Sequence, residues 1–378
     1  MPQSTKSTNN TLTLKSIISI ATICAVTITT AHIVVSPYTR TDILFAGDLM
    51  QHESQLKAAR TQQGTYSYSP CYNYIRREVS NADIAIANLE TTIGDSRYGG
   101  YPSFCAPDSF LYATKGAGFD ILLLANNHCL DRGKKGALRT MQMLDSLSIT
   151  HCGAYRDSTD RATRYPLLVE KEGTKIALLN YTYGLNGIPV PAPLVINLID
   201  KDVIAKDIQR AKELNPHTII ACMHWGDEYV SLPPKRIKEL TTWLLEQGVD
   251  HIIGNHPHVV QPIEVRKDST TAERNTVVYS LGNLISGMYA RGRDGGILVR
   301  MNLTRIYDLC WLSSLKYALT WVARPERDGV ENFTILPADT SLVTREISKK
   351  KMQEFVDDSR KLFGKHNKGI AEEYTITP

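Results

Sequence analysis

The sequence lacks the short loops that bind nucleotides or present a catalytic serine. No G-x-G-x-x-G segment opens a helix, no Walker loop is present, and no G-x-S-x-G elbow occurs. These absences exclude a dinucleotide-binding domain, a P-loop nucleotidase and a serine hydrolase of the elbow type. We therefore predict no nucleotide cofactor.

An excess of charge of one sign is also missing. The 378 residues contain 43 Lys and Arg against 39 Asp and Glu, a net charge of +4, and no block of like charge lies in the middle of the chain. Nucleic-acid binding usually needs a basic patch or stripe, so we expect no nucleic-acid partner. The basic residues of 346–378 predict a solvated C-terminal helix and tail.

Cysteine is present without the spacing that would give it a structural task. The seven cysteines include no C-x-x-C pair, which excludes a zinc ribbon, and a chain of this length does not need a disulfide scaffold. If the chain is exported, a Cys71–Cys105 bridge is one reading. Two buried free thiols are the other, and spacing does not choose between them.

The N-terminal segment contains a long stretch without charged residues. No Lys, Arg, Asp or Glu lies between Lys15 and Arg40, and Ile17–Val35 is mostly Ile, Val, Ala and Thr. About 20 apolar residues suffice to cross a bilayer as a helix, and the lysines before this run predict a cytoplasmic N-terminus. We predict a single-pass membrane protein whose C-terminal domain lies outside the cytoplasm; secretion after signal cleavage is the alternative. The expected segments are a tail at 1–15, a signal-anchor at 16–36 and a linker at 37–41.

From residue 42 onward, short apolar runs alternate with amphipathic helices. The runs are continuous, as in strands buried on both faces, and lie at Asp42–Gly47, Ala82–Asn88, Phe119–Asn126, Thr174–Tyr181, His217–His224 and Val249–Asn255. Helical spacing is clear at Lys134–Leu147 and Pro234–Gly248. This alternation predicts an α/β layered fold. Two later runs, Thr276–Asn283 and Gly295–Leu303, have no helix between them and suggest antiparallel strands of a second sheet.

Metal-ligating or proton-transferring residues follow these runs. In open α/β sheets, ligands bind at the carboxyl ends of the strands. The residues at those ends are Asp48, Asn88, Glu90, Asn127, His128, His224, His256 and His258. Taken singly, each has a structural explanation as a helix cap, a turn residue or a hydrogen-bonded core histidine. Together, carboxylate, amide and imidazole groups suit Zn, Mn or Fe, and their number predicts two divalent ions.

The segment His256-Pro257-His258 presents two imidazoles from one turn. Pro257 fixes its own φ and disfavours the helical region for the residue before it, so we expect an extended His256. Residues two apart in an extended segment face the same side. The two histidines can therefore serve two neighbouring metals on that side, or one metal and one hydrogen bond.

In order, the motifs Gly-Asp, Asn-Leu-Glu, Asn-Asn-His, His-Trp-Gly, His-Pro-His and Tyr-Ser-Leu-Gly-Asn resemble the CapA family of poly-γ-glutamate capsule-synthesis proteins, a branch of the calcineurin-like metallophosphoesterase superfamily. The resemblance runs from about Asp42 to about Leu303. It implies a metallophosphoesterase-type four-layer α/β/β/α sandwich at 42–303, with a dinuclear metal site between the sheets. We assign 304–345 to closing strands. At the first motif this chain has Met50 where the phosphatases usually carry histidine.

The resemblance also implies roles, residue by residue. They are first-site ligands for Asp48 and His258, second-site ligands for Asn127, His224 and His256, a bridging carboxylate for Glu90, and a general acid for His128. Asn88 lies at the position nearest to the superfamily's bridging aspartate.

Several neighbours of these motifs are candidates for supporting roles. Asp131 either orients His128 or caps the helix that follows it. Arg97 and Tyr101, in a loop that contains Gly-Gly, can grip a polyanion or belong to an ordinary surface loop, and Tyr229 and Asn88 complete the expected substrate contacts. The expected substrate is an anionic envelope polymer or a phosphate-containing molecule.

Three functional hypotheses remain open. The first is a metal-dependent hydrolase or transferase of capsule polymer, working with other membrane proteins of capsule synthesis. The second is a non-catalytic assembly or export factor. The third is an extracytoplasmic phosphoesterase acting on a phosphodiester or a lipid-linked phosphate.

Overall fold

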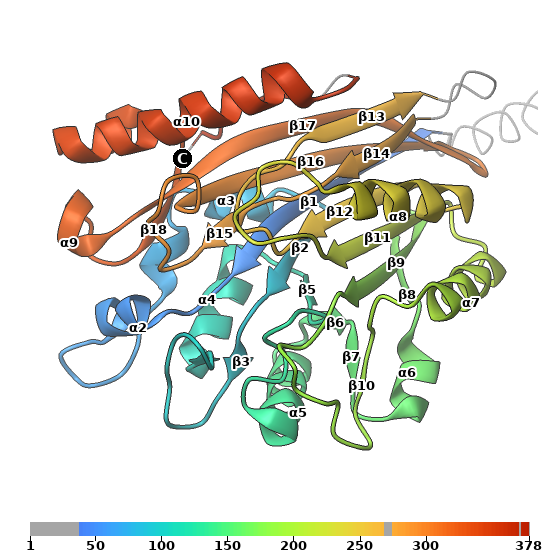
Figure 1. Ribbon diagram of the computed structural model, residues 1–378, viewed down its shortest axis with the longest axis horizontal. Coiled ribbons are helices and arrows are strands. Elements are labelled where there is room, and N and C mark those ends of the chain that lie inside the picture. The colour runs from blue at the N-terminus through green and yellow to red at the C-terminus, as the bar shows by residue number, and fades with distance from the viewer. Residues whose placement is uncertain (1–37, 268–273, 370–371, 378) are drawn as a thin grey trace, which may run out of the picture. The chain divides into compact units, whose positions relative to one another are not determined.

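A computed structural model describes residues 38–267, 274–369 and 372–377 of the chain (Figure 1). The described residues from 39 onward form one compact unit. The predicted tail at 1–15 and signal-anchor at 16–36 lie outside the described residues. None of the described helices combines the length and apolar character that a bilayer span requires.

The first sheet is built around four parallel strands, β1, β2, β5 and β6, and continues antiparallel through β16, β17 and β18. Its strands are β18 (Thr334–Pro337), β17 (Leu309–Ala323), β16 (Gly295–Ile306), β1 (Tyr38–Leu49), β2 (Ile84–Leu89), β5 (Ile121–Leu123) and β6 (Thr150–Cys152), with β15 (Asn283–Ile285) on β1 and β19 (Glu372–Glu373) on β17. Residues 38–41, expected as linker, belong to β1. There Arg40 Nε donates to Asn302 Oδ1 at 2.7 Å.

The second sheet has parallel strands at its centre and an antiparallel strand at each edge. Its order is β13 (Ile263–Lys267), β14 (Arg274–Val278), β12 (His251–Asn255), β11 (Thr218–His224), β9 (Thr174–Thr182) and β8 (Leu167–Lys171). Two small pairs, β7 (Ala154–Tyr155) with β10 (Val195–Ile196) and β3 (Thr92–Ile93) with β4 (Cys105–Ala106), border the sheets.

Helices cover the sheets. They are α2 (Glu53–Ala59), α3 (Arg76–Ser80), α4 (Asp108–Ala117), α5 (Gly133–Ser146), α6 (Ser158–Arg164), α7 (Lys201–Glu213), α8 (Lys235–Glu246), α9 (Pro325–Asp328) and α10 (Glu346–His366), with 3₁₀ turns η1 (Ser69–Tyr72) and η2 (Thr340–Leu342).

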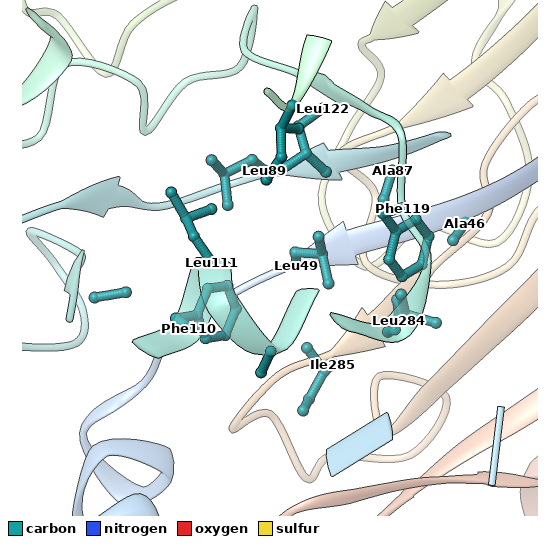
Figure 2. Close-up of a cluster of buried hydrophobic side chains, with 14 of the residues drawn as sticks. Ala46, Leu49, Ala87, Leu89, Phe110, Leu111, Phe119, Leu122, Leu284 and Ile285 are labelled. Atoms are coloured by element: carbon teal, nitrogen blue, oxygen red, sulfur yellow. The ribbon is translucent and has the colours of Figure 1, made fainter. Parts of the chain in front are cut away.

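Three buried clusters order these elements into layers. One joins alternate residues of β1 and β2 to α4 and α5; Figure 2 shows Phe110 and Leu111 of α4 packed near Leu49 and Leu89. A second cluster fills the space between the two sheets, and a third joins β9, β11 and β12 to α7 and α8. Because successive residues of a strand face opposite sides, a strand with apolar side chains on both faces contributes to two clusters. The α/β class predicted from the sequence is confirmed, with helices outside two packed sheets.

One prediction about the sheets was wrong. The runs expected as antiparallel strands of one second sheet belong to different sheets instead: β14 lies parallel to β12 in the six-stranded sheet, whereas β16 pairs with β17 in the other. The two runs meet at the antiparallel bridge between Gly282 and Gly296. The chain crosses between the sheets after β14, and local periodicity carries no information about that crossing.

The C-terminal helix is more than a solvated tail. α10 lies along β17 (Figure 1) and buries Met352, Phe355, Val356 and Phe363 in the cluster between the sheets. Its charged residues occupy the other face, as in an amphipathic helix that seals a core.

Cys71 and Cys105 are free, buried thiols. Cys71 packs in the cluster under α4, where burial raises the pKa of its thiol. The disulfide reading is therefore not supported, and the free-thiol reading holds.

His251, at the start of β12, should make folding stability sensitive to acid. Burial lowers its pKa to about 4, and its Nδ1 accepts the N–H of Thr276 at 3.2 Å. An unfolded imidazole takes up a proton near pH 6.5, so the unfolded state binds protons first as the pH falls. This residue's contribution is present above pH 6.5 and is lost between 6.5 and 4, by up to about 3 kcal/mol.

Urea unfolding of the His251→Gln variant between pH 7.5 and 4.5 checks this expectation. The variant should lose less unfolding free energy over that range than the native chain. His366→Gln, on α10, is the control. Equal acid sensitivity in all three proteins would contradict the assignment.

Candidate metal centre

The predicted strand-end residues converge on one buried place between the sheets. Asp48 is the residue before the last of β1, Asn88 lies in β2 with Glu90 just after that strand, and His224 ends β11. The loops after β5 and β12 bring the other four residues. Each of the eight is at most 4% exposed: Asp48, Asn88, Glu90, Asn127, His128, His224, His256 and His258. The parallel strands of two sheets thus deliver their carboxyl ends to a common point.

Asp48, Glu90 and His258 form one half of the centre. Their ligand atoms lie within 4.8 Å of one another. The Nδ1 of His258 is 3.0 Å from Asp48 Oδ2 and 3.1 Å from Asn283 Oδ1. Its Nε2 lies 3.7 Å from Glu90 Oε1. With Nδ1 held by these two oxygens, the lone pair of Nε2 faces the centre, as in histidines that bind metal through one nitrogen and are oriented through the other.

Glu90, His224 and His256 form the other half. Their ligand atoms also lie within 4.8 Å of one another, so Glu90 belongs to both halves. His224 Nε2 is 2.9 Å from Asn127 Oδ1 and 3.7 Å from Glu90 Oε1. The geometry agrees with the ligand groupings and the bridging position expected from the family resemblance. The roles themselves stay predictions.

Asn88 places an amide at the middle of the ligand set. Its Nδ2 donates to Asp48 Oδ1 at 2.8 Å and to Glu90 Oε2 at 3.2 Å, and lies 3.3 Å from His224 Nδ1. Its Oδ1 accepts from Asn126 Nδ2 at 3.3 Å. Asn88 therefore lies among the metal candidates rather than at a substrate-facing position, and its amide hydrogens occupy the place where a cation would suit the two carboxylates.

Burial sets the protonation of these groups. It raises the pKa of Glu90 well above its ordinary value, with the neighbouring Asp48 charge adding to the effect. It lowers the pKa of His224 well below 6.5, helped by the adjacent imidazoles, and lowers the pKa of His256 to about 4. At neutral pH both imidazoles are neutral, which is the form that binds a metal.

Two buried atoms of the site are suited to bind a cation. Glu90 Oε1 and His256 Nδ1 have no hydrogen-bond partner, although unpaired buried polar atoms are costly. A divalent ion satisfies a carboxylate oxygen and an imidazole nitrogen together. The donor set of oxygens and imidazoles therefore fits Zn, Mn or Fe.

His128 and Asp131 form a pair beside this centre. His128 Nδ1 is 2.8 Å from Asp131 Oδ2, and the same carboxylate oxygen accepts the N–H of Phe104 at 2.7 Å. The N-cap position of α5 is Arg132, and it makes no side-chain cap. Asp131 therefore orients His128 and does not cap the helix. The ring of Phe104 meets His128 edge-on at 4.6 Å.

Replacing Asp131 with alanine should destabilise the protein by about 2 kcal/mol, because the change leaves the buried Phe104 N–H and His128 Nδ1 without their acceptor. Asp131→Asn, which keeps one acceptor oxygen, should cost less. Urea unfolding at pH 7.5 measures both, with Asp95→Ala on the neighbouring exposed loop as the control. An Asp131→Ala variant as stable as the native chain would show that the contact is dispensable.

His256 departs from the extended conformation expected before Pro257. Its φ is +100°, and that of His258 is +56°. The His256 ring packs 4.4 Å from the ring of Tyr183 and 4.8 Å from that of His224, so tertiary contacts select a backbone conformation that the local sequence disfavours. Non-glycine residues with such φ values gather at functional sites.

Gly47 permits the close approach that holds Asp48. A Cβ at this position would lie 2.0 Å from the carbonyl oxygen of Gly282, and the Asp48 N–H donates to that oxygen at 3.0 Å. The Gly-Asp motif is therefore a packing requirement: the small residue lets β1 pass against the chain that carries Asn283.

The predicted substrate residues lie around the centre rather than in it. Tyr229 is 39% exposed, and its ring is 6.1 Å from that of His258. Tyr101 is 76% exposed and meets Phe104 edge-on at 6.2 Å. Arg97 is exposed, and its carbonyl accepts from Arg132 Nη2 at 3.3 Å. The structure brings none of these three among the metal candidates.

Sequence reasoning missed three residues of the site. Tyr183 follows β9 and covers His256 and His224. Asn283 orients His258, and Glu228 groups with His256 and His258 from the exposed side. A signal existed for each: Tyr183 also follows a predicted strand, Asn283 ends the Tyr-Ser-Leu-Gly-Asn motif, and Glu228 comes two residues after His-Trp-Gly.

A family model described as bacterial capsule synthesis protein PGA_cap matches residues 42–288. This chain belongs to the PGA_cap family. The matched segment contains every strand-end residue from Asp48 to His258. It also includes Asn283, which orients His258.

Curated relatives of this PGA_cap chain carry related descriptions. The capsule biosynthesis protein CapA of Bacillus anthracis is 30% identical over 216 residues, covering 54% of this chain and 50% of that protein. The PGA biosynthesis protein CapA of Bacillus subtilis is 30% identical over 189 residues, covering 49% and 47%. The chain spans about half the length of these relatives. A probable polyglutamine synthesis accessory protein of Mycobacterium tuberculosis is 25% identical over 223 residues, 55% of this chain and 57% of that protein.

Solved structures resemble the chain more distantly. The calcineurin-like phosphoesterase YfkN from Bacillus subtilis aligns with a TM-score of 0.41 and 12% identity, over 86% of this chain and 99% of that one. A phosphatase from Mycoplasma pneumoniae aligns with a TM-score of 0.40 and 13% identity, over 74% and 93%.

Proposed function

We propose that this PGA_cap protein is a metal-dependent hydrolase or transferase that acts on an anionic capsule polymer and holds two divalent transition metal ions. The observation that carries the proposal is the pair of buried ligand groups that share Glu90. A carboxylate common to two groups suits a bridging ligand, and two bridged ions suit hydrolysis. We also propose that the fold is a four-layer α/β/β/α sandwich of the metallophosphoesterase type.

When bound, the ions would supply an activated water and charge stabilisation for the reacting group. Asp48 and His258 would hold one ion, and His224, His256 and Asn127 the other. His128 would donate a proton to the leaving group, with Asp131 fixing its ring through Nδ1 so that Nε2 is the atom that carries the proton. Tyr183 would shield the imidazoles on the open side.

The substrate class follows from the relatives' descriptions and from the surroundings of the site. The relatives carry names in capsule, PGA and polyglutamine synthesis. We take PGA as poly-γ-glutamate, whose free carboxyl groups make it a polyanion, and propose this polymer class instead of the uncharged polyglutamine. Arg97, Tyr101 and Tyr229 would contact such a chain. The location we propose is the outer side of the cell membrane, with the predicted signal-anchor at 16–36 as the membrane attachment, beside other membrane proteins of capsule synthesis.

A second candidate function rests on Asn88. Its amide lies in the middle of the ligand set and donates to one oxygen of Asp48 and one oxygen of Glu90. A cluster held together by such hydrogen bonds without metal would suit a non-catalytic assembly or export factor, in which the cluster organises the fold. Phosphodiester hydrolysis, the third hypothesis, is one of the possible outcomes of the test below.

The test is metal content followed by a substrate screen. The full chain is purified, loaded with Mn, Zn or Fe, and analysed for bound metal. The loaded protein is then incubated with poly-γ-glutamate and with a generic phosphodiester. Metal binding with polymer cleavage supports the proposal. Cleavage of the phosphodiester alone would indicate a phosphoesterase. Absence of metal under every loading condition would overturn the hydrolase proposal and favour the assembly factor.

A further inference from the structure

A hollow opens beside the metal centre, on the side of His258. It has a volume of about 480 Å³ and lies between α10 and the loops that follow β12 and β15. Its lining includes Tyr229, Val259, Arg293, Phe355, Lys361 and Lys365. Val259 is bonded to His258 along the chain, and the Tyr229 ring is 6.1 Å from the His258 ring. A ligand in the hollow therefore lies next to the metal candidates.

The rim of this hollow is basic. Asp358 is the only acid among its lining residues, and it is already paired with Arg291, whose Nη2 donates to Asp358 Oδ1 at 2.8 Å. Lys361 and Lys365 have no ion pair within 4.0 Å in the described part of the chain. They lie one turn apart on α10, where like charges cost stability. Lys365 lies in the last turn of α10, where a cation is favoured by the helix dipole, but that does not remove the repulsion between the two lysines. An anion bound in the hollow would reduce this repulsion.

Arg293 links the hollow to the metal centre. Its guanidinium carbon lies 3.4 Å from the centroid of the Tyr229 ring, a cation–π contact that holds the charge at the junction. The carbonyl of Arg293 accepts from Asn283 Nδ2 at 2.8 Å. Asn283 in turn orients His258. The same loop therefore positions one cation of the rim and one candidate ligand.

The floor of the hollow is apolar. Val259, Val260 and Phe355 are buried at its base. A ligand that fits must carry charge along one side and aliphatic groups along the other. The cations are spread over a loop and a helical turn instead of meeting at one point, which suits a row of single charges better than one dianion.

We propose that this hollow is an anion-binding subsite, continuous with the metal centre, that takes a polymer segment with carboxylates on short aliphatic links. The inference rests on the proposed function for the polymer that it names. Lys361, Lys365 and Arg293 pair with successive carboxylates, and Phe355 and the valines contact the methylene groups. The next unit of the polymer then lies at His258.

The test measures binding without turnover. The full chain, stripped of metal by chelation, is titrated with a short fluorescein-labelled oligomer of γ-linked glutamate, and anisotropy is recorded. The variant is the double change Lys361→Glu and Lys365→Glu. The control is Lys349→Glu with Lys350→Glu, which alters the net charge of α10 equally but lies outside the hollow. Metal content of each loaded protein is measured in parallel.

We expect the Lys361/Lys365 variant to bind the oligomer at least about tenfold more weakly, equivalent to about 1.4 kcal/mol, and the control to bind as the native chain does. Added salt should weaken native binding. Equal binding by both variants overturns the subsite. So does inorganic phosphate that displaces the oligomer at equal concentration, or lysine-dependent binding to vesicles of anionic phospholipid without binding of the oligomer. Because metal content is measured separately, the binding result would still test the subsite even if the hydrolase proposal failed.

Discussion

The Glu90→Gln variant is expected to hold neither metal ion. Glu90 is the one carboxylate that belongs to both ligand groups, and glutamine offers a neutral oxygen in place of a charged bridge. The native chain should bind about two ions and Glu90→Gln close to none, because bridging carboxylates hold paired sites together. Elemental analysis after loading and desalting measures both.

Histidine variants divide the centre into its halves. His224→Ala leaves the group of Asp48, Glu90 and His258 intact, and His258→Ala leaves the group of Glu90, His224 and His256. Each should retain about one ion of the proposed pair. His366→Ala is the control and should match the native content. Full metal content in Glu90→Gln would show that Glu90 is not a bridge.

Metal should stabilise the fold more strongly at pH 8 than at pH 5. The pKa of Glu90 is raised in the folded protein, so its contribution to stability is intact below pH 4.5 and is lost as the pH rises through the folded pKa. A bound cation removes that loss by pairing with the ionised carboxylate. At a metal concentration about a thousand times Kd, the gain in unfolding free energy is about 4 kcal/mol.

Chemical unfolding with and without metal at the two pH values tests this expectation. Glu90→Gln should show neither the metal-dependent gain nor the loss of metal-free stability with rising pH. The neutral imidazoles of His224 and His256 need release no proton when metal binds at these pH values. A gain of equal size at both pH values would contradict this account.

Much of the centre was predictable because it depends on strand ends. An apolar run that is followed by a carboxylate, an amide or an imidazole predicts both a buried strand and a candidate ligand. Asp48, His224 and His258 were identified in this way. The α/β class followed from the same runs. Parallel strands put such residues at one edge without any knowledge of the pairing order.

What the sequence could not predict depends on contacts between distant segments. The conformation of His256 is selected by the Tyr183 and His224 rings, against the local preference imposed by Pro257. The sheet to which β14 belongs depends on a crossing of the chain. The basic stripe of α10 suggested a solvated tail, yet Phe355 and Met352 on its other face close a core. Each is a choice among locally acceptable states that only tertiary packing decides.

The hydrogen bond between His258 and Asp48 joins positions 210 residues apart in the chain. Asp48 belongs to the first sheet and His258 follows a strand of the second, so no fragment that ends before His258 can assemble this half of the centre. Retained metal would therefore certify that both sheets have formed and met. For a chain in production or after storage, the metal-to-protein ratio becomes an assay of correct folding, readable without any knowledge of the substrate.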